Sequence, residues 1–177
     1  TSTTSTSTTT TTTTIPFPSD LSPITGLPLE DETLGQRRLL AVKIDNHPQA
    51  LPQSGVEQAD AVVELLVEGI TRFLTFWMES DSEYLGPMRS GRPTDATVLA
   101  PLNKPTFARS GAQDWVQSFI VQRDIHQIGE IRGDATFRVS KFSSPHNLFV
   151  NTVALREAAD ARGFANEPPA PLWEFGP

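Results

Sequence analysis

The chain has 177 residues, of which 37% are hydrophobic and 20% are charged, and this ordinary composition predicts a single globular unit. A formal net charge of -7 and an isoelectric point near 4.9 argue against a protein that binds the nucleic-acid backbone, because such proteins carry clustered lysines and arginines. The sequence contains no cysteine, which excludes disulfides and thiolate sites, and no apolar run approaches the roughly 18 residues of a membrane-spanning helix.

Both ends of the chain differ in composition from its middle. Residues 1–14 are all threonine or serine and cannot bury enough apolar surface to offset the entropy of ordering, so they are predicted to form a disordered tether. Such segments are typical of glycosylated surface stalks, although a plain linker has the same composition. Residues 15–28 are punctuated by prolines and predict an extended lead-in to a domain at 29–165, and the proline-rich residues 166–177 predict a linker.

The first half of the domain is predicted to be mainly β-structure. Residues 39–44 are a short aliphatic run followed at once by polar residues, the pattern of a buried strand that ends in a polar turn. Residues 60–79 also fit one face of a helix, but Gly69 interrupts them and their alternation favours a β-hairpin. In that hairpin Glu64 and Glu68 share a face, and Arg72 lies in an otherwise apolar row, where it needs a partner.

The second half of the domain is predicted to alternate between strands and helices. Pro93 can begin a helix that reaches about residue 100. Residues 106–109 predict a strand that leads into a second helix, and residues 136–139 and 152–162 predict a further strand and helix. The stripe of the second helix would be Trp115, Val116, Phe119 and Ile120. The predicted fold class is α/β, of the mixed α+β kind, with a mixed β-sheet of several short strands and flanking helices.

The loop at residues 86–95 contains two arginines beside a predicted helix start. It resembles a phosphate loop of the form GxxxxGK[ST], but Arg92 replaces the lysine and Pro93 replaces the hydroxyl residue, which argues against nucleotide hydrolysis. Arg89 and Arg92 still offer forked donors suited to a carboxylate or phosphate. The alternative is that both arginines only form structural ion pairs, with partners drawn from Glu64, Glu68, Glu83 and Asp95.

Two further polar loops contain histidine. Asp45, Asn46 and His47 follow the first predicted strand, a position that favours a functional site in α/β sheets. Asp45 and His47 could act as orienter and base, and His146 with Asn147 supplies a second imidazole. No metal site and no cofactor are predicted, because no HExxH spacing or cysteine pair accompanies them. The alternative is that these side chains only satisfy hydrogen bonds within their turns.

Six segments, in this order and spacing, resemble the YerB-like bacterial lipoprotein family across about residues 24–149. They are 40–48 (LAVKIDNHP), 52–55 (PQSG), 58–60 (QAD), 67–74 (VEGITRFL), 86–93 (GPMRSGRP) and 144–148 (SPHNL). The resemblance implies an extracytoplasmic, cell-surface lipoprotein whose molecular role is uncharacterised. It also implies a smaller C-terminal domain after the linker at 166–177, and a membrane attachment only through a lipid-bearing cysteine, which this sequence lacks.

The leading hypothesis is a module that binds an anionic small molecule, a cell-wall fragment or an envelope protein, without nucleic acid or cofactor. It predicts that the three polar loops converge, with Arg72 beside them. The candidate binding residues are Asp45, Asn46, His47, Arg72, Arg89, Ser90, Arg92, Asp95, His146 and Asn147. Two alternatives are a cell-wall or phosphoester hydrolase, in which His47 or His146 is the base beside Arg89 and Arg92, and a passive scaffold.

Overall fold

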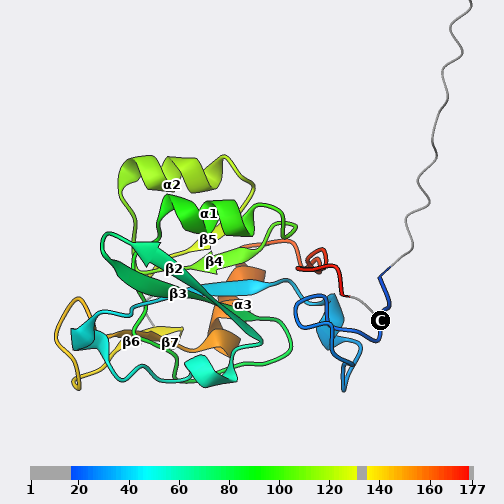
Figure 1. The fold of residues 1–177 in the computed structure, drawn as a ribbon, viewed down its shortest axis with the longest axis horizontal. Helices are drawn as coiled ribbons and strands as arrows, with labels where there is room; N and C mark the ends of the chain where they lie inside the picture. The colour runs from blue at the N-terminus through cyan, green and yellow to red at the C-terminus, as the bar shows by residue number, and fades with distance from the viewer. Residues whose placement is uncertain (1–16, 131–134, 176–177) are drawn as a thin grey trace, which may run out of the picture.

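Five strands form a mixed sheet at the centre of the fold (Figure 1). The structure is a computed structural model that describes residues 17–130 and 135–175, so the tether predicted at residues 1–14 lies outside the described residues. The sheet order is β2-β3-β1-β4-β5, in which β1 pairs antiparallel with β3 and parallel with β4, and β4 pairs parallel with β5. The strands are β1 (Leu40–Ile44), β2 (Ala61–Val67), β3 (Ile70–Trp77), β4 (Thr106–Ala108) and β5 (His126–Ile128).

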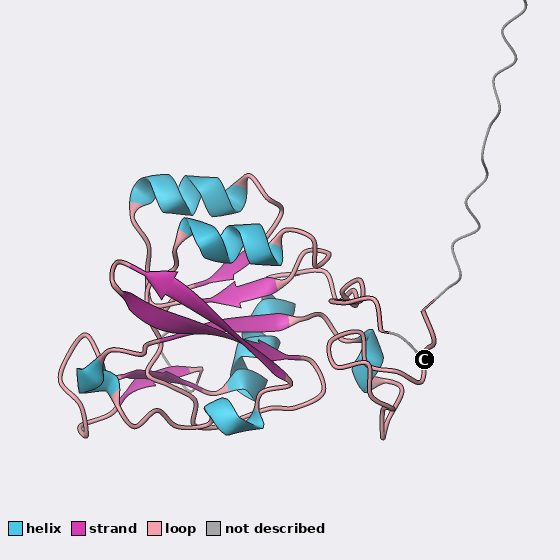
Figure 2. Cartoon of the chain, viewed as in Figure 1, coloured by secondary structure: helices cyan, strands magenta, loops and turns pink. Residues whose placement is uncertain are grey.

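Helices cover both faces of this sheet (Figure 2). Helices α1 (Pro93–Leu99) and α2 (Asp114–Val121) lie on one face. Helix α3 (Thr152–Ala161) and a small second sheet of β6 (Thr136–Arg138) and β7 (Leu148–Val150) lie on the other. Three short 3-10 helices span Leu34–Gln36, Pro48–Ala50 and Val56–Gln58. The predicted α+β fold with a mixed sheet and flanking helices is confirmed.

Strand β1 is buried on both of its faces, which explains its unbroken aliphatic sequence. Ala41 belongs to the core beneath α1 and α2, whereas Leu40, Val42 and Ile44 belong to the core that includes Leu155 and Ala159 of α3. No helix of the described residues has the length and hydropathy needed to cross a membrane.

The predicted hairpin is formed by β2 and β3. Its two-residue turn is Glu68-Gly69, and both residues have positive φ, 52° and 87° respectively, as a type I′ hairpin turn requires. Exposure alternates along β2, with Val62, Glu64 and Leu66 more exposed than their neighbours. Leu65 pairs with Arg72, which is 5% exposed, so the arginine lies in the apolar row as predicted.

Several details differ from the sequence expectations. The short strands β5 and β7 were not predicted, and neither has the length from which periodicity can be recognised. Trp115 does not join the buried stripe of α2, where Val116 and Ile120 are buried, but is 59% exposed. Its indole Nε1 donates to the side chain of Gln113 at 2.7 Å, which satisfies its only polar atom at the surface.

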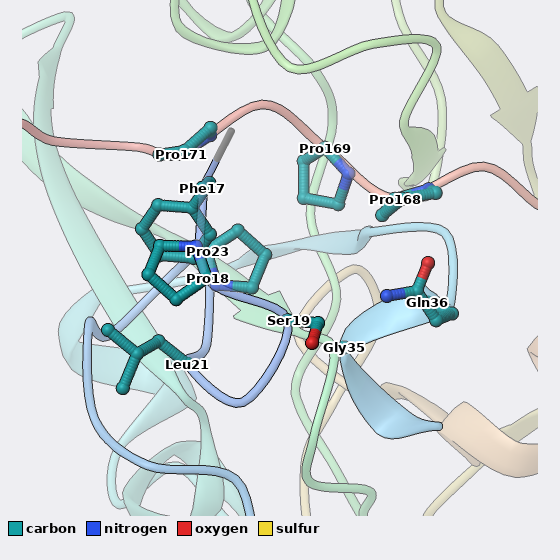
Figure 3. Close-up of a pocket in the computed structure, with 10 residues that line it drawn as sticks. All are labelled: Phe17, Pro18, Ser19, Leu21, Pro23, Gly35, Gln36, Pro168, Pro169 and Pro171. Carbon is teal, nitrogen blue, oxygen red and sulfur yellow. The ribbon is translucent and has the colours of Figure 1, made fainter. Parts of the chain in front are cut away.

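The lead-in and the C-terminal segment pack against each other at one end of the molecule. Leu172 N donates to the carbonyl of Pro23 at 2.7 Å, and the rings of Phe17 and Phe175 lie 6.1 Å apart. Figure 3 shows the pocket of about 180 Å³ between the two segments. Its lining is proline-rich and has no charged side chain: Phe17, Pro18, Ser19, Leu21, Pro23, Gly35, Gln36, Pro168, Pro169 and Pro171. That residues 166–177 lead to another domain stays a prediction.

The half-buried carboxyl of Glu79 at this end should give the stability a distinctive pH dependence. Burial raises the pKa of Glu79 above 4.5, although the Ser22 hydroxyl donates to it and acts in the opposite direction. Because the folded pKa is the higher one, the stability that Glu79 contributes is present at low pH and is lost as the pH rises through that pKa. Glu79→Gln should therefore gain stability relative to wild type between pH 4 and pH 7, measured by urea unfolding. A difference in the free energy of unfolding between Glu79→Gln and wild type that stays constant from pH 4 to pH 7 would contradict this expectation.

Candidate functional site

The candidate site lies at the carboxyl ends of the parallel strands β1 and β4. Arg89 N donates to Lys43 O at 2.8 Å, and Ser110 N donates to Arg89 O at 3.1 Å, so the arginine loop runs between the two strand ends. On its other side Met88 N donates to Leu148 O at 2.6 Å, which brings the loop before β7 to the same place. Polar side chains after neighbouring parallel strands commonly meet at such an edge.

Asp45 joins the three predicted loops. Its Oδ2 lies 3.2 Å from Nε of Arg89 and 2.7 Å from Nδ1 of His146, and its Oδ1 accepts the backbone N–H of His47 at 3.1 Å. The rings of His47 and His146 are stacked, with centroids 4.7 Å apart. The side chain of Asp45 is fully buried. The predicted convergence of the loops is thus observed, whereas a binding role for these residues stays a prediction.

A second buried carboxylate, Asp95, supports the arginine loop from the side of α1. Its Oδ1 lies 2.6 Å from Nζ of Lys43, and its Oδ2 accepts the backbone N–H of Arg92 at 2.7 Å. Both side chains of this ion pair are 0% exposed. Burial lowers the pKa of Lys43, while the negative charge of Asp95 opposes that shift.

Sequence reasoning missed Lys43, although a signal was present. A single charge inside an aliphatic strand that is buried on both faces requires a buried counter-charge, because an isolated buried ammonium is very costly. From its sequence pattern, the run 39–44 was interpreted only as a strand.

Arg72 is a buried cation of the site that has no ion-pair partner among the described residues. Its Nη1 donates to the carbonyl of Ser90 at 3.1 Å, and its buried Nε has no hydrogen-bond partner. Among the described residues no carboxylate forms an ion pair with it. Burial lowers the pKa of Arg72 and the positive charges of Arg92 and Arg89 lower it further, whereas the charges of Asp45 and Glu68 raise it. Because Ser90, whose carbonyl accepts from Arg72, lies between Arg89 and Arg92 in the loop, the three arginines are grouped at this place, and we call Arg72, Arg89 and Arg92 the arginine cluster.

Arg92 pairs with the turn of the hairpin rather than with the core. Its Nε and Nη2 lie 3.1 Å from the two carboxylate oxygens of Glu68, whose side chain is 68% exposed. The predicted structural ion pair between the loop and Glu68 is thus present for Arg92. Arg89 instead pairs with Asp45, which was not among the acidic residues expected as structural partners of the two arginines.

Arg109, directly after β4, is a further cation that sequence reasoning missed. It is 5% exposed, its Nη2 donates to the side chains of Gln117 and Gln127, and its buried Nε has no partner. Burial lowers its pKa. The sequence feature that could have identified Arg109 is its position at the end of a predicted strand, next to Ser110, because the other candidate loops also follow strand ends.

The remaining candidates lie at the border of this arrangement. Asn46 donates to Thr71 Oγ1 at 2.7 Å, and Asn147 accepts from Arg138 at 2.8 Å, so the hydrogen bonds of these amides go to residues other than Asp45. The hydroxyl of Ser90 is 3.5 Å from that of Ser110. Within the described part of the chain, no three histidine, aspartate or glutamate side chains gather as a metal site requires.

A pocket of about 310 Å³ opens beside the stacked histidines. It is lined by Gln49, Lys141, Phe142, Ser143 and His146. Nδ1 of His47 accepts the backbone N–H of Gln49 at 3.2 Å, whereas Nδ1 of His146 contacts Asp45. Of the two imidazoles, only His146 therefore combines a carboxylate partner with a place on the pocket wall.

Comparisons with known proteins match most of the chain. The family model described as "Protein of unknown function (DUF3048) N-terminal domain" matches residues 24–165. A Bacillus subtilis (strain 168) protein named "Putative lipoprotein YerB" is 32% identical over 156 residues, 81% of this chain and 44% of that protein. A crystal structure of the Bacillus subtilis YerB protein aligns with a TM-score of 0.77 and 30% identity, covering 85% of this chain and 53% of that one. The chain spans about half the length of these relatives.

Proposed function

The chain belongs to the DUF3048 N-terminal domain family, and we propose that it is an extracytoplasmic module that binds an anionic ligand at the arginine cluster. The location is inferred from the relative that is named a lipoprotein and from the hydroxyl-rich composition of residues 1–14. The ligand would be an acid-bearing small molecule or cell-wall fragment, or an acidic group of an envelope partner.

The unpaired guanidinium of Arg72 is the observation that carries this proposal. A buried cation is normally paired, because its desolvation is costly. Arg72 has one neutral carbonyl partner and an unused Nε–H, and the charges of Asp45 and Glu68 act against the repulsion by its two arginine neighbours without forming an ion pair with it. An oxyanion at this place would supply the missing acceptor and offset the repulsion.

The charges at this edge also contrast with those of the whole chain. The cluster and its neighbours Lys43 and Arg109 supply five cations, and Asp45, Asp95 and Glu68 supply three carboxylates. This excess of positive charge occurs in a protein whose formal net charge is -7. A positive region of this kind attracts anions selectively.

Binding of inorganic phosphate to the full chain at low salt, measured by calorimetry, tests the proposal. Wild type should bind saturably, and Arg89→Met should bind at least about tenfold more weakly, because a hydrogen bond to a charged group is lost. Arg162→Met, an exposed arginine that caps α3, is the matched control and should bind as wild type does. Equal binding by all three proteins, or none, would favour a passive scaffold.

A cell-wall or phosphoester hydrolase is the second candidate, favoured by the 2.7 Å contact between Asp45 and His146 beside the pocket. His146 would act as the general base that activates water, and Arg89 would stabilise the developing negative charge. Turnover of bis(4-nitrophenyl) phosphate or of wall fragments should then be abolished by His146→Ala and retained in Arg162→Met. Absence of turnover in wild type would contradict this candidate.

A further inference from the structure

Glu68 holds its carboxylate against the arginine cluster from an exposed turn. It is the first residue of the two-residue hairpin turn, and its φ of 52° lies in the left-handed region that non-glycine residues rarely adopt. Its carboxylate makes a two-point contact with Arg92, through Nε to Oε1 and Nη2 to Oε2, both at 3.1 Å. This fork is the geometry with which arginine binds carboxylate and phosphate ligands.

All three members of the cluster act on this carboxylate. The contact with Arg92 lowers the pKa of Glu68 most, and the charges of Arg72 and Arg89 lower it further. Glu68 thus occupies the place at which a soluble anion would be attracted by the same three cations.

Glu68 also differs from the other two carboxylates near the cluster, because it can leave without disturbing the core. Asp45 and Asp95 are fully buried and support the backbone of the loops, whereas the side chain of Glu68 is 68% exposed. At its neighbour Gly69 an added Cβ would meet no atom within 4 Å, so this side of the turn is not packed against the rest of the molecule.

We propose that the carboxylate of Glu68 occupies the binding position on Arg92 in the free protein, and that the acid group of the ligand displaces it. This inference rests on the proposed function and makes it more specific. The ligand carries a carboxylate or a phosphate that presents two oxygens to the fork of Arg92, and the charges of Arg72 and Arg89 attract the same acid group. Glu68 competes with that group and lowers its apparent affinity.

Anion titrations of Glu68→Gln test the exchange against a matched control. Glu64→Gln removes the same charge from the same hairpin, but Glu64 contacts Thr71 at 2.6 Å rather than an arginine. Inorganic phosphate and acetate are titrated separately into the full chain at fixed ionic strength, and NMR of the arginine Nε–H groups reports binding. Urea unfolding of both variants verifies that they are folded.

The expected result is that Glu68→Gln binds the preferred anion about two- to fivefold more tightly than wild type, because an exposed competing ion pair has been removed. Glu64→Gln should bind as wild type does, and the tighter of the two probes identifies the acid group as phosphate or carboxylate. Equal or weaker binding by Glu68→Gln, with saturable binding by wild type, would overturn the exchange and leave the proposed function standing. No saturable binding by any of the proteins would overturn both.

Discussion

Replacing Lys43 with methionine is expected to lower the free energy of unfolding by about 3–5 kcal/mol. Methionine retains most of the volume of the lysine stem in the central strand but removes the ammonium that lies 2.6 Å from Asp95. The carboxylate of Asp95 would then remain buried, with the backbone N–H of Arg92 as its one remaining hydrogen-bond partner among the described residues. Urea unfolding at neutral pH measures the loss.

The double variant Lys43→Met, Asp95→Asn separates charge from packing. It should recover much of the loss, because no unpaired charge remains in the core and asparagine still offers an acceptor to Arg92. If Lys43→Met lowered the free energy of unfolding by less than about 1 kcal/mol, water would have to reach the ion pair, which would contradict the complete burial of both side chains.

Replacing Asp45 with asparagine is expected to cost about 3 kcal/mol, the lower end of the range for a broken buried pair, because Arg89 is 23% exposed and regains some hydration. The substitution keeps the shape of the side chain but removes the negative charge shared by Arg89 and His146. The loops at 86–92 and 143–147 should lose protection from amide hydrogen exchange together, because Asp45 is the side chain that both contact.

Asp20→Asn provides the control for this change, since Asp20 is exposed and lies in the lead-in. It should unfold within about 0.5 kcal/mol of wild type. Faster exchange in one loop only, after Asp45→Asn, would show that Asp45 does not hold the two loops together.

Much of the fold could be predicted from local patterns. The aliphatic run of β1, the interruption at Gly69 and the proline at the start of α1 each identify an element that the structure contains. The strands β5 and β7 could not be predicted, because three residues carry no periodicity and their pairing depends on neighbours distant in sequence. Trp115 was misplaced because an amphipathic stripe on α2 can be shifted by one residue without changing the pattern.

The location of the candidate site could be predicted from the sequence, but the ion-pair partners of its charged residues could not. Strand ends and polar loops identified Asp45, Arg89 and His146, and the resemblance to the family, now confirmed, linked their segments. The partner of each charge depends on tertiary geometry, which is why Asp45 rather than a glutamate pairs with Arg89. Lys43 and Arg109 were missed because each was read as part of a strand, although burying an uncompensated charge is costly and such a residue is therefore a candidate for a site.

The Nε–H resonance of Arg72 during a phosphate titration of the wild-type chain gives the most direct test of anion binding at the arginine cluster. This group is buried and unpartnered in the structure. The proposal predicts a saturable downfield shift of this resonance, with the same midpoint as the calorimetric titration, because an oxyanion becomes its acceptor. A resonance that does not move while phosphate binds elsewhere, or a protein that binds no phosphate at low salt, would contradict the proposal.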